Sequence, residues 1–158
     1  VLMAQKQLTG WRVNEADMTA VAQNLYVAGI GHLADAHIGE LSGGQAQMVS
    51  VCQALTRRAD VYLFDEPTSA LDLRHQLDVM DRMRTAMRER NAIGIVALHD
   101  LNLAARYADH LVLIGAGKIL NQGPPDQVLS DSLIAQTYDV AIETSSGPRK
   151  ELNVHAYT

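Results

Sequence analysis

The sequence predicts an α/β fold in which a helical segment is followed by part of a mostly parallel sheet. Apolar residues recur at helical spacing up to about residue 58. Two short apolar runs, at residues 61–64 and 93–98, then flank a helical pattern over residues 72–90. Strands that alternate with helices in this way are typical of parallel sheets covered by helices. We expect three regions: a helical subdomain at 1–58, an α/β part at 59–144, and a loosely ordered tail at 145–158.

Composition excludes several classes of protein. The chain has 158 residues, 47% of them hydrophobic, which suits one domain or part of one. A net charge of −5 argues against nucleic acid as the main partner. The single cysteine rules out a disulfide framework, and no apolar stretch approaches the roughly 18 residues of a membrane helix. No secretory signal opens the chain, and because it starts at Val1 we interpret it as cut from something longer.

Two helices are expected in the first region. Asn14 is placed as an N-cap, with Asp17 three residues later as a weak capping box, and Gly29 ends the helix. A second apolar stripe follows Gln45. The apolar positions of the two helices are Met18, Val21, Ala22, Leu25 and Ala28, then Met48, Val51, Cys52 and Leu55.

The second region predicts two buried parallel strands, at 61–64 and 93–98, joined by a helix. Leu73, Leu77, Met80, Met83 and Met87 are expected on the core face of that helix. A short helix at 101–107 follows, and Gly115-Ala116-Gly117 predicts a hairpin. Two short helices are expected after the Gly123 turn, at 126–129 and 132–138.

Asp65 and Glu66 come directly after the first apolar strand. Ligands bind at the carboxyl edge of open α/β sheets, so these carboxylates are candidates for chemistry. Asp65 is suited to hold Mg²⁺ through water, and Glu66 to orient or deprotonate an attacking water. The alternative is that both acids only cap a turn before Pro67.

The segment Leu41-Ser42-Gly43-Gly44-Gln45 predicts an anion site at the start of a helix. Ser42 can cap the helix, and two glycines let backbone N–H groups approach a ligand closely. The alternative is an ordinary serine cap, but glycine inside a helix costs up to about 1 kcal/mol relative to alanine. A simple cap does not require that cost.

The order of these motifs resembles the ATP-binding cassette (ABC) ATPases. Leu-Ser-Gly-Gly-Gln precedes Asp65-Glu66 by one helix, Ser69-Ala70-Leu71-Asp72 follows, and a second strand ends at His99. The resemblance implies a P-loop NTPase fold that uses ATP and Mg²⁺. It implies that the signature residues contact the γ-phosphate of ATP bound by the opposite subunit, and that His99 also contacts a γ-phosphate. It further implies that Asp65 holds Mg²⁺ and that Glu66 is the catalytic glutamate. Asp72 is expected at the dimer interface. The signature residues are Ser42, Gly43, Gly44 and Gln45.

The sequence also departs from the family pattern. It contains no Gly-x-x-x-x-Gly-Lys-[Ser/Thr], the loop that cradles the β- and γ-phosphates. Ala46 and Met48 stand where arginine is frequent in the family. We therefore expect the C-terminal part of a cassette, starting inside its helical subdomain.

Three further stretches resemble importer ATPases for iron-siderophore complexes, haem and cobalamin. They are residues 71–76, residues 99–109 and Gln122-Gly123-Pro124-Pro125. The resemblance implies a second ATPase subunit and a membrane permease as partners, at the cytoplasmic face of the cell membrane. Two alternatives stay open: a catalytically inert module that only dimerises or binds a partner, and an ATPase with a soluble role such as translation or DNA repair.

Overall fold

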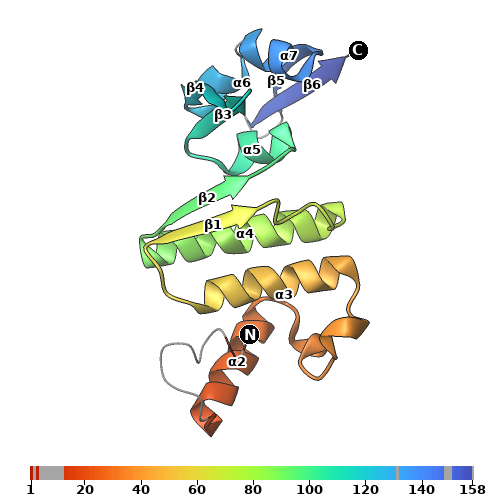
Figure 1. Ribbon diagram of the computed structural model, residues 1–158, viewed down its shortest axis with the longest axis vertical. Coiled ribbons are helices and arrows are strands. Elements are labelled where there is room, and N and C mark those ends of the chain that lie inside the picture. The colour runs from red at the N-terminus through yellow and green to blue at the C-terminus, as the bar shows by residue number, and fades with distance from the viewer. Residues whose placement is uncertain (2, 4–12, 131, 148–150, 158) are drawn as a thin grey trace. The chain divides into compact units, whose positions relative to one another are not determined.

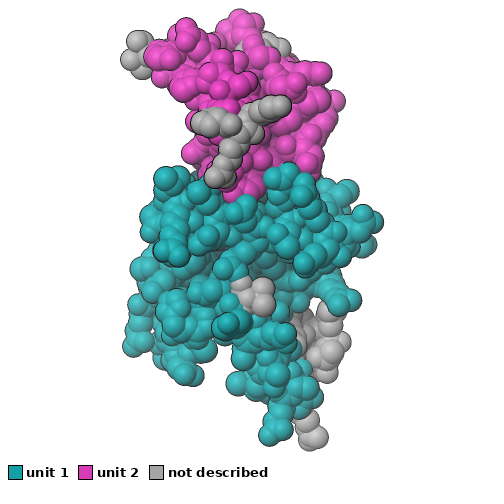
Figure 2. All heavy atoms as spheres, turned by 180° about the vertical axis from the view of Figure 1, so that it is seen from behind, with its two compact units in different colours: residues 1–97 teal, residues 98–158 magenta. Residues whose placement is uncertain are grey.

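The computed structural model describes residues 1, 3, 13–130, 132–147 and 151–157. Its contacts divide the chain into two compact units, Val1–Ala97 and Leu98–Thr158 (Figure 2). This division differs from the boundary predicted near residue 58, which stays a prediction. The start of the chain up to residue 12, apart from Val1 and Met3, lies outside the described part, and so do positions 148–150 and 158 of the expected tail.

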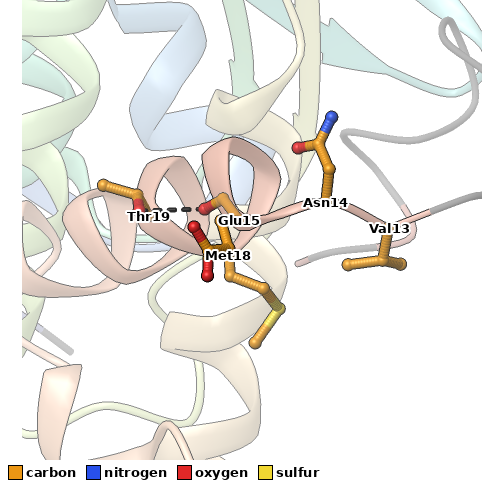
Figure 3. Close-up of a pocket in the computed structure, with 5 residues that line it drawn as sticks. All are labelled: Val13, Asn14, Glu15, Met18 and Thr19. Atoms are coloured by element: carbon orange, nitrogen blue, oxygen red, sulfur yellow. Dashed lines mark hydrogen bonds between the residues drawn. The ribbon is translucent and has the colours of Figure 1, made fainter.

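Two of the helices in the first unit begin at the predicted caps. Helix α2 spans Glu15–Val27, and Asn14 and Asp17 form a full capping box. After two 3₁₀ turns, Gly31–Leu33 and Ile38–Glu40, helix α3 spans Gly43–Thr56 with Ser42 as its N-cap. Figure 3 shows a hollow beside the start of α2, where Thr19 donates a hydrogen bond to the Glu15 carbonyl.

A small core joins these two helices. Cys52 packs in it, and burial raises the pKa of its thiol, which favours the unreactive protonated form. The buried members of this core are Val21, Leu25, Ile30 and Cys52.

The predicted strand–helix–strand unit is present. Strand β1 (Val61–Asp65) pairs in parallel with β2 (Ile93–Ala97), and helix α4 (Leu73–Arg90) connects them (Figure 1). Two hydrogen bonds connect the start of β1 to the C-terminal ends of α3 and α4. The Tyr62 hydroxyl donates to the carbonyl of Arg57, the residue that follows α3, and the Arg90 side chain at the end of α4 donates to the Tyr62 hydroxyl at 2.6 Å. The sequence therefore predicts this unit's elements within a few residues.

The strands are not fully buried, contrary to the prediction. Tyr62 and Phe64 are buried, whereas Leu63 is 75% exposed and Ile95 is 56% exposed. The register aligns Leu63 with Ile95, so both lie on one face of the strand pair. In the described residues this face has no covering layer that buries it. On α4 the prediction is confirmed for Met80 and Met83, which are buried. It is wrong for Leu73, which occupies the first position of the helix and is 71% exposed, and Val79 is buried although it was not predicted.

In the residues described, the second unit contains three short helices and two antiparallel strand pairs. Ala116 and Gly117 both have positive φ, as a tight two-residue hairpin turn requires. Its elements are α5 (Leu101–Tyr107), β3 (Leu111–Gly115), β4 (Lys118–Gly123), α6 (Pro125–Leu129), α7 (Ser132–Tyr138), β5 (Ala141–Ser146) and β6 (Leu152–Tyr157).

The prediction of a loosely ordered tail is wrong for the residues described. Strand β6 pairs with β5 along its whole length, and Val154 is buried in the core of the second unit. That core also contains Leu113, Val128, Leu129 and Ile134. The polar residues Ser145 and Ser146 thus belong to strand β5.

Candidate functional site

The predicted signature segment forms a reciprocal cap at the start of α3. The Gln45 N–H donates to the Ser42 hydroxyl at 3.2 Å, and the Ser42 N–H donates to the Gln45 side-chain oxygen at 2.9 Å. This arrangement fixes the first turn and uses one of the orphan donors of the helix start. The N–H groups of Gly43 and Gly44 belong to the same turn, where the helix dipole favours an anion.

Gly44 has a packing reason that the sequence did not indicate. A Cβ atom built on Gly44 would lie 3.0 Å from the Ala70 carbonyl oxygen and 3.3 Å from a Leu71 methyl group. Any side chain at this position would therefore push the start of α3 away from the loop that precedes α4. Gly43 is less constrained, since its nearest neighbour would be the Ala70 Cβ at 3.9 Å.

Asp65 and Glu66 stand at the carboxyl end of β1, as predicted. Asp65 is exposed on the same strand face as Leu63. Glu66 has φ of 44°, a left-handed conformation that is unusual for a residue with a side chain. Its N–H donates to the Ala97 carbonyl of β2 at 3.2 Å, which ties this peptide to the end of the neighbouring strand.

Gln47 is a site residue that sequence reasoning missed. Its side-chain amide donates to the Glu66 carbonyl at 3.3 Å, and Ser69 donates to the same carbonyl from its hydroxyl at 3.1 Å and its N–H at 3.2 Å. These bonds hold Glu66 in its strained conformation and connect it to the signature helix. Gln47 lies two residues beyond the motif, but a contact across 19 residues has no local signal.

Asp72 is the N-cap of α4. Its carboxylate accepts the His75 N–H at 3.0 Å and contacts the His75 ring nitrogen Nδ1 at 2.9 Å. The His75 backbone N–H is the largest cause that lowers the pKa of the Asp72 carboxyl, followed by the bond to the His75 side chain. Its predicted place at a dimer interface stays a prediction, because the structure contains one chain.

The signature start and the Asp72 loop meet at one cavity of about 870 Å³. Ser42, Gly44 and Gln45 line it from one side and Asp72 from the other. Its charged and titratable lining residues are His32, Cys52, Asp72, Arg74, His75, Asp78 and Arg82. Four of the eight predicted site residues therefore line this cavity, and a fifth, Gly43, lies next to it in the chain.

His99 belongs to the second unit and is exposed there. It directly precedes Asp100, the N-cap of α5, whose carboxylate accepts the N–H groups of Asn102 at 2.8 Å and Leu103 at 3.0 Å. His99 thus directly precedes the residue whose side chain caps the N-terminus of α5.

For a metal, Asp65 supplies the hard oxygen donor that Mg²⁺ prefers, in an exposed position where water ligands can remain. The described residues do not gather three or more His, Cys, Asp or Glu side chains into a cluster. Among these residues no helix combines the length and apolarity needed to cross a bilayer.

Comparison with known proteins supports the resemblance. The protein family described as ABC transporter matches residues 3–69. The ferric enterobactin transport ATP-binding protein FepC of Escherichia coli (strain K12) is 39% identical over 134 residues, 85% of this chain and 49% of that protein. The hemin import ATP-binding protein HmuV of Streptomyces coelicolor is 38% identical over 149 residues, 94% of this chain and 53% of that protein.

Solved structures show the same fold. A metal-chelate type ABC transporter in an inward-facing conformation superposes with a TM-score of 0.82 at 21% identity, covering 99% of this chain and 64% of that one. The ATP-binding cassette MJ0796, in a dimeric post-hydrolysis state with ADP and Pi, gives a TM-score of 0.67 at 25% identity, covering 74% and 50%.

The chain spans about half the length of the curated relatives it matches. The matching half contains the signature, the Asp65-Glu66 strand end and His99. In sequence and in fold, the chain therefore belongs to the ABC transporter family of ATP-binding cassettes.

Proposed function

We propose that this chain supplies the signature half of a composite ATPase site in an importer for iron-siderophore, haem or a related metal chelate. The observation that carries the proposal is the packing of the signature helix start against the Asp72 loop, with Glu66 bonded to Gln47 of the same helix. The names of the siderophore and hemin relatives support the cargo class. The partners are a second cassette subunit and a membrane permease, at the cytoplasmic face of the membrane.

The chemistry is phosphoryl transfer to water, in which catalysis is mostly positioning and charge stabilisation. The Gly43 and Gly44 N–H groups and the Ser42 side chain act on the γ-phosphate of ATP held by the partner subunit. Asp65 would hold Mg²⁺ through water, and the ion would neutralise charge on the phosphates. Asp65, Glu66 and His99 belong to the other composite site, where a complete cassette holds ATP with its own phosphate loop. There Glu66 would orient the attacking water and take its proton, and His99 would contact the γ-phosphate.

The test is complementation of a full-length homologous cassette whose own signature has been disrupted. That partner holds ATP with its phosphate loop, and this chain provides the missing signature. Partial ATPase activity should return on mixing. Ser42→Arg in this chain should abolish the recovery, because a bulky cation replaces the cap at the phosphate-facing turn.

Two matched variants sharpen this test. Ser50→Arg makes the same change on an exposed position of α3 and should leave the recovery intact. Glu66→Gln should also preserve it, because in this pairing the partner's own glutamate acts on its bound ATP. If the chain folds and associates with the partner yet restores no activity, the proposal is wrong. Equal loss with Ser42→Arg and Ser50→Arg would point to damage to α3 in general.

The alternative is an inert interaction module, favoured by the missing phosphate-binding loop in this sequence. Both hypotheses expect the 158-residue chain by itself to bind Mg-ATP weakly and release no phosphate. They differ in the complementation assay, where an inert module associates without restoring turnover. Micromolar binding by calorimetry with steady phosphate release from the chain alone would contradict both.

A further inference from the structure

The amide side chain of Asn102 forms a two-point clamp on strand β6. Its oxygen accepts the Val154 N–H at 2.8 Å, and its nitrogen donates to the Val154 carbonyl at 3.2 Å. The two bonds reproduce the pairing that a neighbouring strand would provide, across 52 residues of sequence. An alanine at 102 has neither group, and an aspartate keeps the acceptor but loses the donor.

The clamp joins the start of α5 to the core of the second unit. Val154 is 7% exposed and packs with Leu113, Val128, Leu129 and Ile134. Asn102 is the second residue of α5, and its own N–H is bonded to the cap residue Asp100. The first turn of α5 is therefore attached both to its cap and to a buried strand.

A helix as short as α5 depends on such attachments. Seven residues are too few for stability in isolation, so tertiary contacts set its direction. Leu103, Ala104 and Tyr107 are buried and fix its inner face. The direction of the first turn therefore depends on the Asp100 cap and on the Asn102 clamp. His99 directly precedes Asp100 in the chain.

We propose that Asn102 is a positioning residue for His99, acting through the docked strand β6. The inference rests on the proposed function in one respect, namely that His99 contacts phosphate. Asn102 acts by positioning His99 and not by contact with the nucleotide. The C-terminal strand, expected from sequence to be loose, thereby becomes part of the support of His99.

The test is nuclear magnetic resonance on the isotope-labelled chain without nucleotide or partner. The His99 ring signals are assigned by their loss in His99→Gln and followed at one fixed pH. In Asn102→Ala the Val154 amide should exchange roughly tenfold faster, because its N–H loses the acceptor that protects it. The His99 ring signals should shift or broaden at the same time.

Two variants serve as controls. Asn102→Asp retains the acceptor for the Val154 N–H and should restore most of the protection and of the His99 signal position. Asn121→Ala removes an amide that bonds its neighbour Gln122 in β4 and should change neither readout. If Asn102→Ala fails to fold, Asn102→Ser, whose side chain is too short to hold both Val154 groups, is compared with the wild type and should show the same two changes.

The outcomes separate the possibilities. Faster Val154 exchange with unchanged His99 signals would make Asn102 a strand anchor only and overturn the proposal. Unchanged Val154 exchange would overturn the clamp itself. Neither measurement involves ATP, so a failed complementation assay would reject the proposed function and leave this result standing.

Discussion

Glu66 is a residue whose backbone is more informative than its side chain. A left-handed conformation costs a non-glycine residue about 1–2 kcal/mol. Here the Ala97, Ser69 and Gln47 hydrogen bonds offset that cost. Strained residues of this kind cluster at functional sites. The conformation therefore independently supports Glu66 as a working residue rather than an incidental acid in a turn.

Glycine at position 66 should be more stabilising than alanine. Glycine relieves the strain of the left-handed conformation, and this gain outweighs the extra flexibility of glycine in the unfolded chain. The free energy of unfolding of the Glu66→Gly variant should therefore be about 0.5–1 kcal/mol larger than that of Glu66→Ala. Urea denaturation of both variants measures the difference. The same pair at the exposed helical residue Glu89 should show the opposite order, with alanine better by about 1 kcal/mol. The same order at both positions would contradict the strain argument.

Much of the signature site was predictable at this scale because its bonds are local. Ser42 and Gln45 are three residues apart, and the serine cap was predicted from the sequence. The cap of Asp72 on His75 is equally local but was not predicted. Gln47 bonding to Glu66 and Gly44 packing on Ala70 could not be predicted. Those contacts depend on how α3 meets a distant loop, and the sequence carries no periodic signal for them.

Among the elements, α4 depends on its cap in a pH-dependent way. The lowered pKa means that the folded chain keeps Asp72 ionised to lower pH than the unfolded chain does. The stabilisation is therefore present above the ordinary carboxyl value of about 4 and is lost as pH falls through the lowered folded value.

Replacing Asp72 with asparagine should remove this dependence. Asparagine still caps the helix, but it does not titrate, so the Asp72→Asn melting temperature should fall less between about pH 5 and pH 3 than the wild type. Thermal melts followed by circular dichroism give both slopes. Asp78→Asn, on the same helix away from the cap, serves as the control and should keep the wild-type slope. Parallel curves for wild type and Asp72→Asn would show that the cap contributes nothing to acid sensitivity.

The strand pair β1–β2 differs from its prediction because a sequence run cannot show how many layers cover a sheet. Continuous apolar strands are typical of parallel sheets buried on both faces. In the described residues α4 packs on one face, beside Gly94, which approaches Met87 closely. The composition of β1 thus fits two-sided burial, whereas its observed exposure alternates.

A lysine scan across β1 should reveal the two faces. Leu63→Lys should preserve the melting temperature and lower the binding of a hydrophobic dye, since Leu63 is 75% exposed. Phe64→Lys, one residue along, should lower the stability by more than about 3 kcal/mol, because Phe64 is buried and stacks on Tyr62. Equal effects at the two neighbouring positions would show that the alternation is wrong.

For the whole molecule, the family and the order of elements could be predicted, whereas the boundary near residue 58 stays a prediction. Motifs and helix caps involve residues close together in the sequence, so the α-helices and strands described between residues 15 and 138 are predicted within a few residues. The contacts that group residues into units are long-range. Strand β6 shows this well, because its polar surroundings predicted disorder while Asn102, fifty-two residues earlier, holds its backbone.

The same amide has a consequence for the solubility of the chain. A strand at the margin of a sheet offers unpaired N–H and C=O groups on which another chain can begin to stack. At Val154, where β6 passes α5, the groups facing away from β5 are occupied by a side chain of the same molecule. In the folded chain Asn102 thereby occupies the groups on which another strand could begin to pair at this position.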